Sequence, residues 1–228
     1  MRILVPLLLA FVAQATLAAA DLPTVLSKMN TVAPQFKDMT AKIDWVKYTK
    51  LVDDTFTETG DLWVKKDAKG QVQLRIAFTE PTRKQVRIEK TTFELFNEPI
   101  NQIEEYDLKA KSNELYEGLL LGYGVSGDDL KKRYDITLGP EEPINGQPTV
   151  RLDMIPKDEE DRTAGKSVQM WISTQSWQPL QYKALEHSGD YRLISYSGVK
   201  INPGVKASDL ALDESRAKSK PKRVKQKL

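Results

Sequence analysis

The stretch Gly60–Glu98 carries the strongest pattern in the chain, because short runs of alternating apolar and polar residues follow one another with turn residues between them. In Gln71–Phe78 the apolar side chains occupy every second position, which places them on one face of an extended strand. An antiparallel meander of such strands must cover its apolar face with something else. The residues expected on that face are Leu62, Val64, Val72, Leu74, Ile76, Phe78, Val86 and Ile88.

The segments around this meander predict few helices. Asp21–Phe36 has apolar residues at helical spacing and Pro23 in its first turn, so we expect one amphipathic helix that ends near Pro34. Trp63 lies on the face opposite Leu62 and is expected to pack beneath this helix. A short apolar helix is expected in Ser112–Tyr123, with a second at Asp128–Lys132. The apolar residues of the first are Leu115, Leu119 and Leu120.

The remaining segments predict further strands and the turns between them. Alternation begins at Met39, and a separate strand containing Phe56 is expected before Gly60. A turn is expected from Gly139 to Gly146 and a charged loop at Lys157–Lys166. Roughly ten strands in continuous antiparallel order result. Those expected after Lys132 are Tyr134–Leu138, Val150–Met154, Val168–Ile172, Leu180–Glu186 and Tyr191–Tyr196.

The composition excludes several kinds of active site. The chain has no cysteine and one histidine, so cysteine metal sites and histidine clusters are excluded. His187 lies beside Ser188 and Asp190 in a tight turn, where these side chains cannot adopt the geometry of a catalytic triad. Sequence spacing selects no catalytic pair among the carboxylates. We therefore expect no enzyme activity, no metal and no cofactor.

Residues 1–20 have the features of a secretory signal peptide. Arg2 provides a positive start, Ile3–Val12 an apolar core, and Ala18–Ala20 a small-residue cleavage site before Asp21. The apolar run is shorter than the ~20 residues that a membrane-spanning helix needs. The sequence predicts an exported protein, cleaved after Ala20, that is a soluble monomer in the periplasm.

The charge is distributed unevenly along the chain. Arg2 and the seven basic side chains from Arg216 onward supply eight of the positive charges, so a net charge of +2 becomes −6 without them. We expect a folded domain at 21–213 and a basic, disordered tail at 214–228. The tail either serves only solubility or attracts the protein transiently to anionic lipid headgroups. Nucleic acid is not an expected partner of an exported chain with an acidic domain.

Several segments together resemble the LolA family of periplasmic lipoprotein carriers. The similar segments are the amphipathic first helix, GDLWVKK at Gly60–Lys66, VRLDMIPK at Val150–Lys157 and the long stretch Met170–Asn202. Each segment is a weak motif, but their order and spacing are more specific. The resemblance covers essentially all of Asp21–Asp213.

The resemblance implies a mainly β (α+β) fold: a strongly bent antiparallel sheet forms an incomplete β-barrel, and a short helical lid closes its apolar concave face. It also implies that the protein carries acylated lipoproteins from an inner-membrane lipoprotein-releasing transporter to an outer-membrane acceptor, without chemistry. Leu115, Leu119 and Leu120 correspond to the lid. An arginine that helps to hold the lid shut in the family is replaced here by Lys66, and a lysine lacks the planar donor fork of arginine. This implies a weaker latch or another lipid cargo.

Three alternatives to a lipoprotein carrier remain open from the sequence. One is a lipid-binding or lipid-sensing regulatory module on the same scaffold, as in RseB-type proteins, which predicts a stable protein partner. Another is an envelope hydrolase, which predicts polar groups converging in the cleft. The third is that the apolar strand faces form an ordinary filled core with no cavity.

Overall fold

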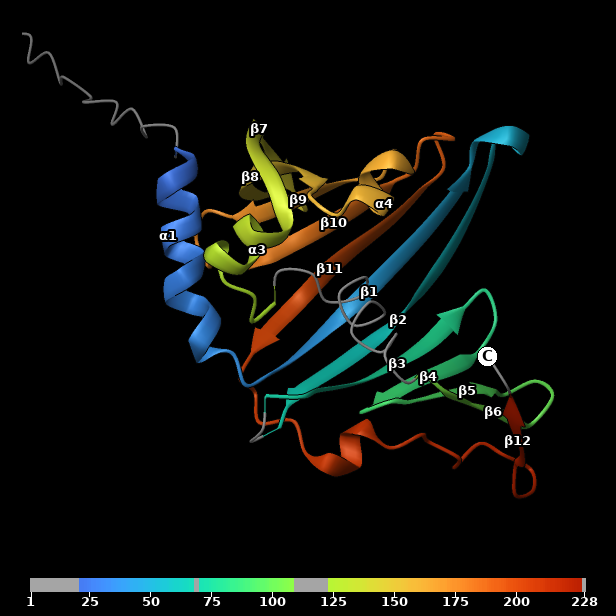
Figure 1. Cartoon of the computed structure of the whole chain (residues 1–228). Coiled ribbons are helices and arrows are strands. Elements are labelled where there is room, and N and C mark those ends of the chain that lie inside the picture. The colour runs from blue at the N-terminus through green and yellow to red at the C-terminus, as the bar shows by residue number, and fades with distance from the viewer. Residues whose placement is uncertain (1–20, 68–69, 109–122, 227–228) are drawn as a thin grey trace, which may run out of the picture.

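The computed structural model describes residues 21–67, 70–108 and 123–226. The expected signal peptide and the expected lid residues Leu115, Leu119 and Leu120 lie outside the described residues. One bent sheet of 12 strands dominates the fold and does not close into a barrel (Figure 1). Its strand order is β12-β6-β5-β4-β3-β2-β1-β11-β10-β9-β8-β7. The predicted fold class, mainly β with an incompletely closed sheet, is confirmed.

The described residues before 109 form one α-helix and six strands. These are α1 (Leu22–Val32), a 3₁₀ turn (Ala33–Gln35), β1 (Asp38–Thr49), a 3₁₀ turn (Lys50–Val52), β2 (Asp54–Lys66), β3 (Val72–Glu80), β4 (Lys84–Glu89), β5 (Thr92–Asn97) and β6 (Gln102–Asp107). The part after 122 contains α3 (Gly127–Arg133), β7 (Tyr134–Ile144), β8 (Gln147–Pro156), α4 (Glu159–Thr163), β9 (Ser167–Ser173), β10 (Pro179–Leu185), β11 (Tyr191–Ile201), a 3₁₀ turn (Ala207–Leu210) and β12 (Lys222–Gln226). Among the described helices, none has both the length and the hydrophobicity needed to cross a membrane.

Helix α1 forms where its sequence pattern predicts. The Asp21 side chain caps it by accepting a hydrogen bond from the Thr24 backbone N–H at 2.8 Å, and Pro23 occupies the first turn. The apolar face of the helix is buried through Val25, Leu26 and Met29. These three residues share one apolar cluster with Leu62 and Val64 of the sheet, so α1 packs on the concave face.

Strand β2 is one continuous strand of 13 residues instead of the two that the sequence suggested. It pairs with β1 over its whole length, and the two form a long hairpin (Figure 1). The pairing of β2 with β3 shifts register between Thr59 and Gly60. A Cβ atom at Gly60 would lie 2.3 Å from the Ala77 carbonyl oxygen, so only glycine lets β3 approach closely enough here.

Strand β7 continues through the region where a turn was expected. The predicted turn at Gly139–Gly146 is confined to Asn145 and Gly146, which have positive φ angles of 50° and 75°. The pairing of β7 with β8 shifts register between Leu138 and Glu141, around Pro140. β7 is an edge strand with β8 as its one neighbour in the sheet, and proline is tolerated on edge strands.

The loop predicted at Lys157–Lys166 contains the short helix α4. Asp158 caps this helix, because its side chain accepts a hydrogen bond from the Asp161 backbone N–H at 3.1 Å. Three acidic residues in the first turn stabilise the helix through their attraction to the positive end of its dipole. The charges that indicated a loop therefore also satisfy a helix N-terminus.

The prediction of a disordered basic tail does not describe residues up to Gln226. Residues 203–226, here called the C-terminal strap, run from β11 across the convex face of the sheet to β12 (Figure 1). Strand β12 pairs in parallel with β6, which also corrects the expectation of a wholly antiparallel sheet. Two ion pairs fix Arg223 of the strap: its guanidinium lies 2.8 Å from Glu94 on β5 and 2.9 Å from Glu214 within the strap.

Gln85 on β4 fixes the middle of the strap. Its side chain is buried, donates to the Asp213 carbonyl at 2.8 Å and accepts from the Asp213 backbone N–H at 2.8 Å. Nearby, Arg75 donates to the Asp209 carbonyl at 3.1 Å, and Lys65 to the Val205 carbonyl at 2.6 Å. These polar contacts hold the strap to the face of the sheet opposite the apolar cluster.

We expect Gln85→Leu to lower the free energy of unfolding by about 2–4 kcal/mol, because the N–H and C=O groups of Asp213 lose their buried partner. Urea unfolding of the mature chain measures this change. Gln71→Leu, an exposed position before β3, serves as the control and should change stability by less than about 0.5 kcal/mol. Equal effects of the two substitutions would contradict the role given to Gln85.

Candidate apolar binding site

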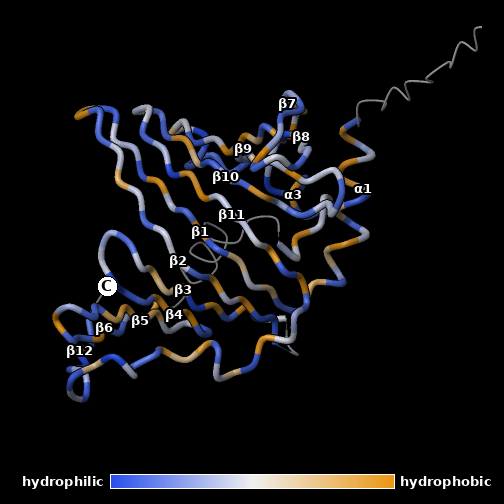
Figure 2. The backbone as a smooth tube through the Cα atoms, turned by 180° about the vertical axis from the view of Figure 1, so that it is seen from behind, coloured by the Kyte–Doolittle hydropathy of each residue, from blue (hydrophilic) through white to orange (hydrophobic). Residues whose placement is uncertain are grey.

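The eight predicted floor residues lie on one face of the sheet. Leu62 pairs with Ile76, and Ile76 pairs in turn with Val86 on the next strand. Val64, Leu74 and Ile88 form a second row across the same three strands. Strand pairing therefore brings together residues that the sequence could place only on separate strands. Figure 2 shows the alternation of hydrophobic and hydrophilic positions along these strands.

The floor residues belong to a larger buried cluster. Seven of the eight are at most 8% exposed, whereas Val72 is half-buried. The cluster also contains residues that sequence analysis did not assign to the site, although the same alternation marks most of them. Those from β1 and β8–β11 include Met39, Ala41, Ile43, Val150, Leu152, Met154, Val168, Met170, Ile172, Tyr182, Ile194 and Tyr196.

Next to this cluster lies a group of partly exposed apolar side chains, here called the apolar rim: Trp45, Val72, Phe93 and Leu95. Leu95 pairs with Val86 and Phe93 with Ile88, so the rim continues the same apolar face onto β5. The Phe93 ring also meets the Tyr106 ring edge-on, with centroids 5.7 Å apart. The apolar surface of the concave face therefore extends beyond the part that is fully buried.

An ion pair lies at one end of the apolar face. Lys84 contacts Glu58 at 2.6 Å, and the two side chains are 31% and 14% exposed. The Lys84 ammonium also lies 5.1 Å from the centre of the Phe78 ring, which in turn contacts Trp45 at 6.1 Å. Because both side chains of this ion pair are largely shielded from solvent, the pair forms a polar boundary of the apolar face at the start of β4.

A second polar boundary lies on β6. The Tyr106 hydroxyl donates to Glu104 at 2.6 Å, and this hydrogen bond raises the pKa of Tyr106 above its usual value of 10.0. Glu104 pairs with Leu95 of the apolar rim. The outer margin of the apolar face on this side is therefore polar.

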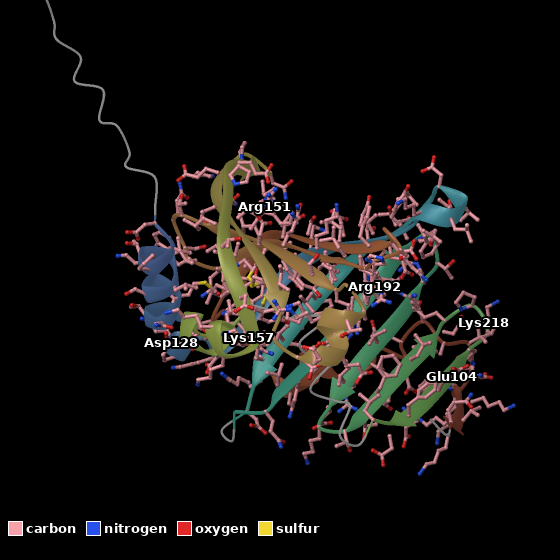
Figure 3. The ribbon with its side chains drawn as sticks, turned by 45° about the horizontal axis from the view of Figure 1, so that its top comes forward. Glu104, Asp128, Arg151, Lys157, Arg192 and Lys218 are labelled. Atoms are coloured by element: carbon pink, nitrogen blue, oxygen red, sulfur yellow. The ribbon has the colours of Figure 1, made fainter. Side chains whose placement is uncertain are left out.

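The opposite half of the concave face contains a hollow of about 490 Å³ between α4 and strands β10 and β11. Tyr182 and Val168 supply apolar surface, whereas Lys166 and Arg192 carry charge, and Figure 3 labels Arg192. Both cations have an acidic partner in the lining: Lys166 lies 2.5 Å from Asp161, and Arg192 lies 3.7 Å from Glu186. Burial raises the pKa of Tyr182 to about 12, so its hydroxyl stays neutral at ordinary pH.

The segment from Tyr123 into α3 is held firmly to the concave face. The buried Tyr123 hydroxyl donates to the Pro179 carbonyl at 2.5 Å, and its ring meets the Tyr196 ring edge-on at 5.2 Å. Burial raises the pKa values of both tyrosines above 10.0, so neither supplies acid–base chemistry near neutral pH. A Cβ at Gly127 would lie 2.5 Å from the Leu26 carbonyl oxygen, so α3 packs directly against α1.

Lys66, the expected latch, lies at the end of β2 beside this segment. Its ammonium is 3.5 Å from the position that a Cβ of Gly124 would occupy. Gly124 is the second described residue after 109–122, the stretch that contains the expected lid. The structure thus places Lys66 next to the chain that leads out of that stretch, and its role as a latch stays a prediction.

Trp63 does not pack beneath α1 as expected. It stacks with Arg75, whose guanidinium carbon lies 4.6 Å from the ring centre. Arg75 also holds the strap, so Trp63 belongs to the convex face. The expectation was wrong because α1 packs on the other side of the sheet, with Leu62 and Val64.

Polar side chains do not converge on a metal site in the described part of the chain: no three histidine or acidic side chains there are placed to bind one ion. The chemistry that the described residues of the concave face support is burial of apolar groups. The ion pair of Glu58 with Lys84 and the bond of Tyr106 to Glu104 give this surface polar boundaries.

No family model matches the sequence, and no curated protein is found as a relative. Solved structures do match. A chain of the MucA/MucB complex from Pseudomonas aeruginosa is 14% identical with a TM-score of 0.50, and the match covers 85% of this chain and 61% of that one. An uncharacterized conserved protein from Thermus thermophilus is 11% identical with a TM-score of 0.53, covering 89% and 97% of the two chains.

The LolA superfamily protein NE2245 from Nitrosomonas europaea also matches, with 12% identity, a TM-score of 0.39 and coverage of 86% and 99%. The structures with TM-scores of 0.50 and 0.53 share the fold of this chain, and membership of the LolA family stays a prediction. At these identities the likeness concerns the fold alone. The chain spans 61% of the length of the chain that it matches in the MucA/MucB complex.

Proposed function

We propose that this protein is a periplasmic carrier that binds the acyl chains of lipoproteins on its concave face and moves them from the inner to the outer membrane. The observation that carries the proposal is the continuous apolar face, which runs from the buried cluster to the partly exposed rim of Trp45, Val72, Phe93 and Leu95. Partly exposed aromatic and aliphatic side chains on a concave surface favour an apolar ligand.

The energetics of acyl transfer explain why a carrier needs such a surface. Each methylene removed from water contributes ~0.8 kcal/mol, so a chain of about 16 carbons contributes roughly 12 kcal/mol. A protein that escorts this chain through water must cover most of its length. The floor residues Leu62, Val64, Val72, Leu74, Ile76, Phe78, Val86 and Ile88 are the proposed acyl-chain contacts, with Leu115, Leu119 and Leu120 as the proposed lid.

The partners follow from this role. An inner-membrane lipoprotein-releasing transporter loads the carrier, an outer-membrane acceptor receives the cargo, and the transfer involves no bond-making chemistry. Lys66 acts as the latch between β2 and the segment before α3. Because its ammonium lacks the planar donor fork of arginine, the latch opens at low cost and favours release.

A second candidate function is a lipid-binding or lipid-sensing module that acts through a protein partner. One observation favours it: a structure that matches this fold is the complex of MucA with MucB, in which two protein chains bind each other. Stable co-purification of an envelope protein, without onward transfer of lipid to membranes, distinguishes this function from carriage. Carriage of a lipid other than a lipoprotein is distinguished by the identity of the bound lipid.

Replacing Phe93 and Leu95 of the rim by serine should weaken binding of a fluorescent long-chain acyl probe by about tenfold, because apolar contact area is lost where the fold does not need it. Fluorescence titration of the mature protein gives the dissociation constant. Ile201→Ser changes a partly exposed isoleucine outside the rim and is the matched control. If the rim variant and the control bind the probe equally, the acyl chain does not lie on the rim.

Lys66→Leu should shorten the retention of bound acyl probe several-fold and reduce hydrogen-exchange protection at Gly124–Ser126, because the charged contact beside this segment is lost. Lys66→Arg should lengthen retention, since its guanidinium donates several hydrogen bonds in a fixed plane. Stopped-flow release into acceptor vesicles and hydrogen exchange measure the two effects. Unchanged release and protection in both variants would rule out a latch at Lys66.

A further inference from the structure

Large apolar side chains are exposed at two turns on the same edge of the sheet. At the β1–β2 turn Leu51 is 93% exposed and Val52 is 66% exposed. At the β5–β6 turn Ile100 is 63% exposed. Strands β1 to β6 are antiparallel neighbours in sequence order. Every second turn between them, including the β1–β2 and β5–β6 turns, therefore lies at the same ends of the strands, here called an edge of the sheet. Figure 1 shows this edge on the side of the molecule opposite α1.

The β1–β2 turn has a fixed conformation. The Tyr48 hydroxyl donates to Asp53 at 2.9 Å across the turn, and the Lys50 backbone N–H donates to Asp190 of the neighbouring β10–β11 turn at 2.8 Å. The Asp53 backbone closes the 3₁₀ turn with a positive φ of 47°. Leu51 and Val52 are therefore presented to solvent by an ordered tip, so binding through them costs little conformational entropy.

Aromatic and basic side chains stand directly behind this tip. Tyr48 stacks on Tyr191 with ring centroids 4.9 Å apart, and the Lys183 ammonium lies 4.1 Å from the Tyr191 ring centre. Tyrosines and lysines behind an apolar tip are the arrangement found where proteins meet the boundary between lipid headgroups and acyl chains.

Unpaired positive charge lies beside the second turn. The strap reaches the β5–β6 turn through the Asn101 side chain, which donates to the Ser219 carbonyl at 3.2 Å, and through the Lys222 N–H, which donates to the Asn101 carbonyl at 3.0 Å. Lys218, Lys220 and Lys222 are exposed, and none of them forms an ion pair with another described residue. Figure 3 labels Lys218 and Glu104 of β6 on this side of the molecule.

We propose that this edge docks on the surface of an anionic phospholipid bilayer. The docking edge is defined by Leu51, Val52, Ile100, Lys218, Lys220 and Lys222. The isoleucine and the two residues of the tip enter the headgroup region, and the three lysines attract anionic headgroups. Two narrow turns offer little of the continuous area that a stable protein–protein interface needs, whereas a fluid headgroup layer adapts to them.

The inference rests on the proposed carrier function, since a carrier must meet a membrane to receive or deliver an acyl chain. It adds the location of that contact and the lipid class that favours it. A strap fixed to the fold also explains how the basic residues keep a constant position relative to the tip, which a disordered tail could not do.

Flotation of the mature protein with vesicles tests the docking edge. Binding to phosphatidylglycerol-containing vesicles should exceed binding to pure phosphatidylcholine vesicles and should weaken as salt rises. Leu51→Ser with Val52→Ser should reduce binding to both vesicle types by about tenfold. Replacing Lys218, Lys220 and Lys222 by glutamine should reduce binding to the anionic vesicles alone, by at least about tenfold.

Two control variants match these changes elsewhere on the molecule. Ile155→Ser alters an isoleucine that is 48% exposed on β8, and glutamine at Lys28, Lys131 and Lys200 removes the same charge from other exposed positions. Both controls should bind vesicles as the unaltered protein does. Equal losses in the controls and the edge variants, or no vesicle binding by the unaltered protein, would overturn the proposal.

The acyl probe separates this inference from the carrier function. The edge variants should keep the probe affinity of the unaltered protein, because none of the changed residues lies in the floor or the rim. Loss of vesicle binding with normal probe binding in these variants supports the docking edge. If the unaltered protein binds the probe normally but does not bind vesicles, the docking edge alone is overturned. If it binds vesicles but not the probe, the carrier function alone is overturned.

Discussion

The fold depends on the burial of one apolar face of a single bent sheet. Leu74, Ile76 and Ile88 are at most 1% exposed, and α1 and α3 contribute to the same cluster. The face continues beyond its fully buried residues to partly exposed ones such as Phe93 and Leu95. The pattern that drives folding thus also provides the surface on which we propose that acyl chains bind.

The convex side of the same sheet carries the C-terminal strap, which covers buried Phe96 and Ile103 as well as polar side chains. Buried Gln85, together with Arg75 and Lys65, holds the C-terminal strap through hydrogen bonds to its backbone. Hydrogen bonds specify position more sharply than apolar contact does, so these contacts fix where the strap lies on the sheet. The strap also places its lysines beside the β5–β6 turn, where the proposed docking edge lies.

Alternation in the sequence was enough to predict the sheet and the face shared by Leu62 through Ile88, because a period of two determines the side of a strand. It was not enough to predict the strap. Arg223 and Lys225 look like part of a disordered basic run until the fold brings Glu94 and Glu105 next to them. Pro140 likewise suggested a turn, although it lies within the edge strand β7. Whether a strand lies at the edge depends on the whole sheet and cannot be read from the sequence around Pro140.

The most direct test of the central claim is native mass spectrometry of the mature protein purified gently from the cell envelope, followed by identification of its bound lipid. We expect a protein with acylated cargo, and triacylated lipoproteins would identify that cargo as the one proposed. Bound phospholipid would retain an acyl-binding concave face but change the cargo. A protein without any apolar cargo, combined with failure to bind the acyl probe, would contradict the carrier function and indicate that the apolar face is a filled core.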